Sequence, residues 1–212
     1  MYKFRKFNSQ KRDYKTRQAF AMNRAVLDLL KTRRSLKPDM LIEPGPSAAE
    51  IDELLTIASR VPDHKKLEPW RFIVFEGDAR RAFGEVIAEA CKAEDKMEPS
   101  ELRLEGERKR FLRSPLVIAV ISRANPKAIA PEWEQILSAG AAAMNLSIAA
   151  NAMGYGVAWI TEWIAYSPRV KAALGLSEHE RVAGFVYIGT PSQRPEDRPR
   201  PELGKIVSRW QA

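Results

Sequence analysis

The sequence predicts an α+β domain: a sheet of about four or five strands, flanked by helices on both sides. Its 212 residues suit a single domain with a sizeable core. The first observation behind this prediction is a set of short apolar runs, of which 116–121 is continuously apolar, as in a strand covered on both faces. The second is that segments with helix-like spacing of apolar residues separate these runs.

The strands are expected where apolar runs meet residues that favour boundaries. Pro115 opens the second run, and Gly154 ends the helix before the third. The segment from Gly154 to Trp159 begins like a dinucleotide fingerprint. However, it runs from helix to strand and has Trp159 where a small residue belongs, so its glycines are interpreted as a helix C-cap and a turn. The four predicted strands are 72–75, 116–121, 157–161 and 182–189.

The helices are predicted from periodicity and from residues that cap or break them. Ser47 followed by Glu50 forms a capping box, and Pro62 stops the helix that follows it. The alanine-rich stretch 136–150 is too short and too interrupted by polar residues for a membrane span, so it is expected in a core or at a subunit interface. The predicted helical segments are 18–32, 47–61, 79–97, 100–112 and 133–153. A proline-rich tail after residue 190 is expected to be extended.

The net charge of +8 is concentrated near the N-terminus, where residues 1–20 contain seven Lys and Arg against one Asp. We therefore predict a basic arm, 1–18, and a single domain, 19–212. The arm lacks the apolar core of a secretory signal. It could be an organelle-targeting segment, an arm that binds nucleic acid or anionic surfaces, or an arm that either is solvated or packs on a partner subunit. The last interpretation is favoured, and nucleic-acid binding is the rival function from another class.

Cysteine and histidine usage narrows the function classes. Cys91 is the single cysteine, which excludes an internal disulfide framework and suits a reducing compartment, the cytoplasm. It lies in a helix-like apolar stretch and is expected to be a buried thiol. No metal site is predicted, because His64, His179 and Cys91 do not have the spacing of metal ligands.

Two segments carry the residues that could bind a flat, phosphorylated cofactor. Arg33, Arg34 and Ser35 lie near a helix end, where planar guanidinium groups and a hydroxyl suit phosphate. These residues could instead compensate the negative end of the helix. The loop 62–70 is held stiff by prolines and carries His64, and it leads into Trp70 and a strand. A lone histidine or tryptophan there could also be structural.

In this order, these segments resemble the nitroreductase family, the FMN enzymes that reduce nitro compounds and quinones. The Pro-Asp-His loop followed by Pro-Trp-Arg-Phe is most similar to the compact subgroup of that family, and the resemblance covers roughly residues 20–210. It implies a three-layer α/β/α sandwich with a mixed, mostly antiparallel sheet, and a homodimer with FMN at the subunit interface. The residues that fall at the family's flavin contacts are Arg33, Arg34, Ser35, His64, Glu68, Trp159, Ile160, Thr161 and Arg200, with Arg198 beside the last.

The resemblance also implies the chemistry. NAD(P)H would reduce FMN, which would then reduce a nitroaromatic, a quinone or a similar electron-poor acceptor in a ping-pong scheme. Arg33 or Arg34 would stabilise negative charge on the reduced ring, and no side chain is named as an acid or base. Glu68 and Ile160 depart from the neutral polar residue and the polar or basic residue expected there. A specialised flavin enzyme of the same fold, one that does not reduce nitro compounds, is the alternative within the family.

Overall fold

A computed structural model describes residues 22–211 of the protein. The chain divides into two units, Met1–Thr32 and Arg33–Ala212. The described part of the first unit contains the helix α2 (Arg24–Thr32), which confirms most of the helix expected at 18–32. The basic arm lies outside the described residues, so the arm and its boundary at residue 18 stay predictions.

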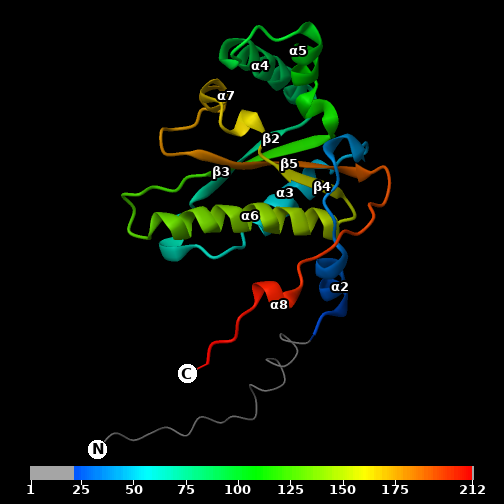
Figure 1. The fold of residues 1–212 in the computed structure, drawn as a ribbon, viewed down its shortest axis with the longest axis vertical. Helices are drawn as coiled ribbons and strands as arrows, with labels where there is room; N and C mark the ends of the chain where they lie inside the picture. Colours follow the sequence, from blue (N-terminus) through cyan, green and yellow to red (C-terminus); the bar gives the residue numbers. More distant parts are fainter. Residues whose placement is uncertain (1–21, 212) are drawn as a thin grey trace, which may run out of the picture. The chain divides into compact units, whose positions relative to one another are not determined.

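The second unit is built on a five-stranded sheet, in which every pair of neighbouring strands is antiparallel (Figure 1). The order is β1-β5-β3-β2, and β4 also pairs with β5. The four predicted strands are confirmed, each with slightly wider or shifted bounds, whereas β1 was not foreseen. The strands are β1 (Leu41–Ile42), β2 (Trp70–Phe75), β3 (Leu116–Ser122), β4 (Gly156–Ile160) and β5 (Arg181–Pro191).

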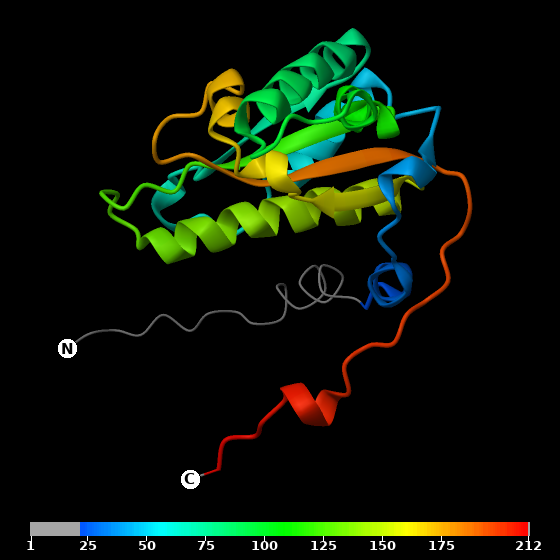
Figure 2. The same ribbon diagram turned by 45° about the horizontal axis from the view of Figure 1, so that its top comes forward.

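Helices cover both faces of this sheet, as predicted (Figures 1 and 2). On one face lie α3 (Ala48–Ala58) and the long α6 (Glu132–Ala152). On the other lie α4 (Asp78–Glu94), α5 (Glu101–Arg108) and the short α7 (Pro168–Ala173). A one-turn helix, α8 (Leu203–Ile206), follows the extended tail. Four 3₁₀ turns complete the described elements: η2 (Pro38–Met40), η3 (His64–Lys66), η4 (Arg110–Arg113) and η5 (Trp163–Ala165).

The central strand β3 divides the core into two layers. All seven of its residues are buried, which confirms the strand covered on both faces. Val117, Ala119 and Ile121 pack into the layer under α4 and η4, together with a cluster of aromatic rings. The alternate residues pack against the aliphatic side chains of α3 and α6. This alternation is the two-residue period of a strand.

Local signals in the sequence set several of these boundaries. Ser47 and Glu50 form the predicted capping box at the start of α3. Gly154 follows α6 with a φ of 91°, a left-handed conformation that glycine adopts without strain and that confirms the predicted turn. Gly156 then opens β4, where a side chain would collide with Leu36 and Leu41. The helix expected at 100–112 is shorter than predicted, because α5 ends at Arg108 and η4 follows as a separate 3₁₀ turn.

Cys91 is buried in α4, as predicted, with 1% of its surface exposed. Burial raises the pKa of its thiol, and Asp95, which accepts a hydrogen bond from Sγ at 3.3 Å, raises it further. No helix of residues 22–211 is both long and apolar enough to cross a bilayer. The same residues contain no cluster of three or more potential metal ligands.

Candidate active site

A narrow recess of about 30 Å³ brings together residues that are far apart in the sequence. Arg33, Arg34 and Ser35 form one wall, immediately before Leu36. The backbone N–H of Leu36 donates to the carbonyl oxygen of Val157 at 2.9 Å, and this bond fixes the segment beside β4. The remaining lining residues come from the C-terminal half of α6 and from β4: Met144, Ser147, Asn151, Val157 and Trp159.

Arg33 presents an unsatisfied donor in this recess. Its Nε is buried and has no hydrogen-bond partner within residues 22–211. A buried N–H group without a partner costs about 1–3 kcal/mol, so native proteins rarely leave one in that state. The recess therefore suits a ligand that brings an acceptor, above all an anionic oxygen.

Arg34 reaches the proline-rich tail. Its Nε donates to the carbonyl oxygen of Glu196 at 2.9 Å and lies 3.9 Å from the Asp197 carboxylate. Arg200 pairs with the same carboxylate at 2.9 Å. The backbone N–H of Arg198 and the side chain of Arg200 both lower the pKa of Asp197. The structure thus brings Arg34 and Arg200 to one carboxylate beside the recess, while the side chain of Arg198 makes no hydrogen bond with another described residue.

Trp159 occupies a fixed position on β4. Its indole N–H donates to the carbonyl oxygen of Ala183 at 3.2 Å. The ring lies over Gly184 on the neighbouring strand, where a side chain at residue 184 would collide with the indole. With 37% of its surface exposed, the ring borders the recess and also a second, larger cavity.

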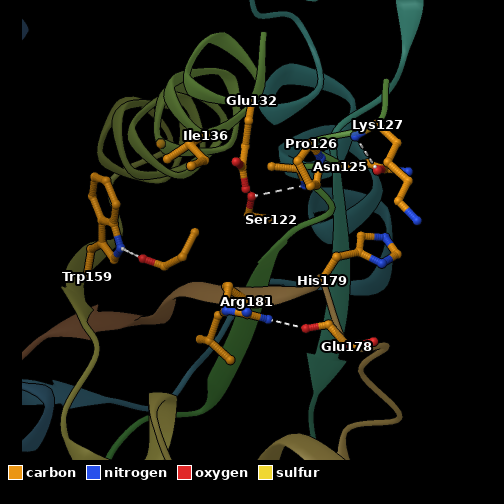
Figure 3. A pocket seen from close by; sticks show the side chains of 14 residues that line it. Ser122, Asn125, Pro126, Lys127, Glu132, Ile136, Trp159, Glu178, His179 and Arg181 are labelled. Carbon is orange, nitrogen blue, oxygen red and sulfur yellow. Dashed lines mark hydrogen bonds between the residues drawn. The ribbon is translucent and has the colours of Figure 1, made fainter. Parts of the chain in front are cut away.

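This larger cavity, of about 730 Å³, lies beside the N-terminal half of α6 (Figure 3). Trp159 and Ile136 supply an apolar wall, and polar side chains gather around the rest. Both signs of charge are present. The labelled polar residues come from the end of β3 and the loop after it, from the start of α6, and from the turn that leads into β5: Ser122, Asn125, Lys127, Glu132, Glu178, His179 and Arg181.

Sequence comparison identifies the family to which this architecture belongs. A sequence model described as the Nitroreductase family matches residues 30–190, most of the chain. The chain belongs to the nitroreductase family. The Escherichia coli K12 protein named "Putative NAD(P)H nitroreductase YdjA" is 36% identical over 169 residues, which are 78% of this chain and 88% of that one.

Solved structures of similar fold agree with this assignment. A nitroreductase-like family protein from Bacillus cereus has a TM-score of 0.77 at 22% identity, over 91% of this chain and all of that one. A Desulfovibrio desulfuricans chain solved in complex with FMN has a TM-score of 0.67 at 22% identity, over 90% of this chain and 99% of that one. These likenesses confirm the nitroreductase-like fold predicted from the sequence.

The loop that carries His64 and Glu68 lies away from the recess of this nitroreductase chain and lines neither cavity. His64 Nδ1 lies 2.7 Å from the Glu134 carboxylate on α6. The Asp63 carboxylate accepts the backbone N–H groups of Leu67 and Glu68 at 2.9 and 3.0 Å. Glu68 is exposed and has no ion pair with a described residue.

The backbone of this loop is strained. Lys65, Lys66 and Glu68 have positive φ angles of 65°, 54° and 47°, which are uncommon for residues other than glycine. The loop is also held against α6, because Trp70 Nε1 donates to Ser138 Oγ at 3.1 Å and that hydroxyl donates to the Pro62 carbonyl at 2.6 Å. A stiff, strained loop of this kind is typical of a functional segment.

Ile160 and Thr161 lie at the end of β4 next to Trp159, and both are half-buried. The sequence did not indicate the polar residues around the larger cavity, because they come from separate loops and form no motif. It also gave no sign of Glu162, the next residue, which has a positive φ and pairs with two arginines. The sequence does show two arginines close together in the segment 110–113. However, no local pattern indicates that they pair with residue 162.

Proposed function

We propose that this nitroreductase-family chain is an FMN-dependent oxidoreductase that takes hydride from NAD(P)H and passes it to electron-poor acceptors such as nitroaromatics or quinones. The observation that carries the proposal is the buried, unpartnered Nε of Arg33 in a recess that also contains Arg34, Ser35 and Trp159. Related chains support it, since YdjA carries the name "Putative NAD(P)H nitroreductase" and the Desulfovibrio structure contains FMN.

The residues present fit FMN. Arg33 and Ser35 would donate to its phosphate or ribityl oxygens, and Arg200, beside Arg34, could turn from Asp197 toward the same phosphate. Trp159, Ile160 and Thr161 would lie along the ring. Bound FMN would supply the redox chemistry, alternating between NAD(P)H and the acceptor. The chain's own part is to hold fixed positive charge near the ring and to orient it.

The larger cavity beside Trp159 would receive the electron acceptor. It has room for a small aromatic molecule, and Trp159 with Ile136 offers the apolar wall on which such a molecule packs. This placement accounts for the exposed indole face of Trp159, which is held in place by Ala183 and Gly184 rather than buried.

A homodimer would complete the site. His64 and Glu68 do not line the recess of their own chain, so we propose that their loop contributes to the site of a second subunit. The exposed apolar side chains on α6 are consistent with a partner packed on this helix, since Trp133, Ile136 and Leu137 are 66%, 42% and 53% exposed. The proposed compartment is the cytoplasm, where a single reduced thiol is ordinary.

The test is the visible absorption spectrum of the purified protein, before and after anaerobic addition of NADPH or NADH. We expect a flavin band in the protein as purified or after it is soaked with FMN, and we expect the band to bleach with at least one of the two nucleotides. A band that persists with both nucleotides argues against the reductase. Absence of any band after soaking overturns the cofactor assignment.

A further inference from the structure

Glu162, the second residue after β4, has an unusual backbone conformation. Its φ of 54° and ψ of −176° lie in a region that is occupied almost only by glycine. A glutamate stays there only when its surroundings hold it, because the strain is of order 1–3 kcal/mol. The contacts of the Glu162 side chain must therefore supply at least this much stabilisation.

Two arginines from η4 hold this carboxylate. Arg113 donates to both of its oxygens, with Nη2 at 2.7 Å and Nη1 at 3.3 Å. Arg110 contributes a third contact, from Nη1 at 2.7 Å. Burial favours a higher pKa for Glu162, but hydrogen bonds from Arg113 and Arg110 outweigh it and lower the pKa, so the carboxylate is ionised at neutral pH.

The two arginines are themselves fixed on the face of the sheet opposite α6. Arg110 also pairs with Glu107, through contacts of 2.5 and 2.8 Å, and Glu107 is only 2% exposed. Arg113 donates to the hydroxyl of Tyr187 at 3.1 Å. Trp163, the residue after Glu162, donates from Nε1 to Glu107 at 3.2 Å. The chain leaving β4 is therefore attached at two consecutive residues to one network.

We propose that Glu162 is a positioning residue for the flavin-facing end of β4: the Arg110–Arg113 clamp on its carboxylate fixes the backbone of Ile160 and Thr161. This inference rests on the proposed function, which places those two residues along the flavin ring. It assigns a role in cofactor binding to a charge network on the far side of the sheet.

The physical reason is pre-organisation. Ile160 is held in the sheet by its pairing with Phe185, but Thr161 is the first residue beyond the strand and lacks such a partner. A peptide group that must meet a ligand binds it more tightly when its orientation is already fixed. The strained Glu162 provides that fixation only while both arginines hold it, since an unclamped glutamate would relax toward an ordinary φ.

The experiment compares Glu162→Gln, Glu162→Gly and Phe83→Leu with the wild-type protein. Phe83 packs against Phe75 and Phe111 in the same layer, and its apolar ring cannot take part in the charge network around Glu162, so its variant controls for general loosening of that layer. Three quantities are measured: hydrogen exchange of the peptide covering 159–166 without FMN, the Kd for FMN by flavin fluorescence, and the reduction potential of bound flavin.

In both Glu162 variants we expect faster hydrogen exchange of the peptide 159–166 and a Kd for FMN about tenfold higher than in the wild type. The reduction potential of the bound flavin should also change. Phe83→Leu should lower the melting temperature and leave the other values near those of the wild type. Wild-type exchange and Kd in Glu162→Gln would overturn the inference. Wild-type protein that takes up no FMN overturns the proposed function instead, and with it the flavin part of this inference.

Discussion

The two faces of the sheet differ in the partners that they give to a half-buried arginine. Under α4 and α5, Arg110 pairs with two carboxylates, and Arg113 pairs with one carboxylate and a tyrosine hydroxyl. On the α6 face, Arg33 has a buried Nε without any partner among residues 22–211. A buried charge that is fully paired contributes to specifying one structure, whereas one left open favours whatever ligand can satisfy it.

The two faces also differ in the kind of side chain that packs on them. Phe75, Phe83, Phe111, Phe185 and Tyr187 fill the first layer with rings in mutual contact. The second layer is built from aliphatic and small side chains of α3 and α6 and is bordered by both cavities of the candidate site. The face under α4 and α5 is thus tightly packed, whereas the face under α3 and α6 borders the cavities that could hold ligands.

The largest expected effect is on the aromatic face. Phe111 is fully buried and its ring contacts four others, at centroid distances of 5.0 to 5.9 Å. Phe111→Ala should reduce the free energy of unfolding by about 3–5 kcal/mol, because it removes these contacts and leaves a cavity. Urea denaturation measures the loss. A change below about 1 kcal/mol would mean that this face is not the rigid one.

An intermediate effect is expected for a paired arginine at the edge of the sheet. Arg71 on β2 donates to both oxygens of Glu180 at 2.7 and 3.1 Å, and these bonds lower the pKa of Glu180 from 4.5 to about 2. The pair therefore stabilises the fold fully above pH 4.5, and this contribution is lost as the pH falls from 4.5 toward about 2.

Replacing the carboxylate of Glu180 tests how much a fully paired arginine contributes to stability. Glu180→Gln should lower the free energy of unfolding at neutral pH by about 1.5–3 kcal/mol, the usual range for hydrogen bonds to charged groups. The difference from wild type should shrink as the pH falls below 4.5, because wild-type Glu180 becomes protonated there. Urea denaturation across this range measures both. A difference that does not vary with pH would show that the charge of Glu180 is not what stabilises the pair.

The smallest effect on stability is expected at Arg33. Arg33→Ala relieves the cost of an unpaired buried donor, about 1–3 kcal/mol, but it also removes the packing of the aliphatic stem. Because these two changes oppose each other, the free energy of unfolding without FMN should not fall by more than about 0.5 kcal/mol. FMN affinity should fall about 100-fold, through the loss of a charged contact. Arg81→Ala, at an exposed position of α4 on the opposite face, is the matched control and should alter neither quantity. Unchanged FMN affinity in Arg33→Ala would remove the distinction between the two faces.

The sequence predicted those parts of the fold that depend on local patterns. The apolar run of β3, the capping box at Ser47 and the glycine turn at Gly154 each have a local cause, and each was found where expected. The two-residue strand β1 has no such pattern, because it exists only through pairing with β5. The short helix α7 likewise begins at a proline within a loop that the sequence left unassigned.

The candidate site was predictable in its residues but not in its contacts. Arg33 and Trp159 could be named from motifs, yet the open donor of Arg33 depends on side chains of α6 and β4 more than a hundred residues away. The pairing of His64 with Glu134 joins residues 70 positions apart. Glu162 contradicts local preference, since it has a positive φ although it is not a glycine, and the two arginines that pair with its side chain come from the separate turn η4.

Cys91 gives this protein a built-in probe of its own breathing motions. As the single cysteine, 1% exposed, it can react with a thiol reagent only when the helical layer that contains α4 opens. If α4 opens only when the whole domain unfolds, added FMN should slow the labelling in proportion to its saturation of the site. If α4 opens alone, labelling should be indifferent to FMN. One thiol, without any engineered label, thus reports whether the two faces of the sheet open together.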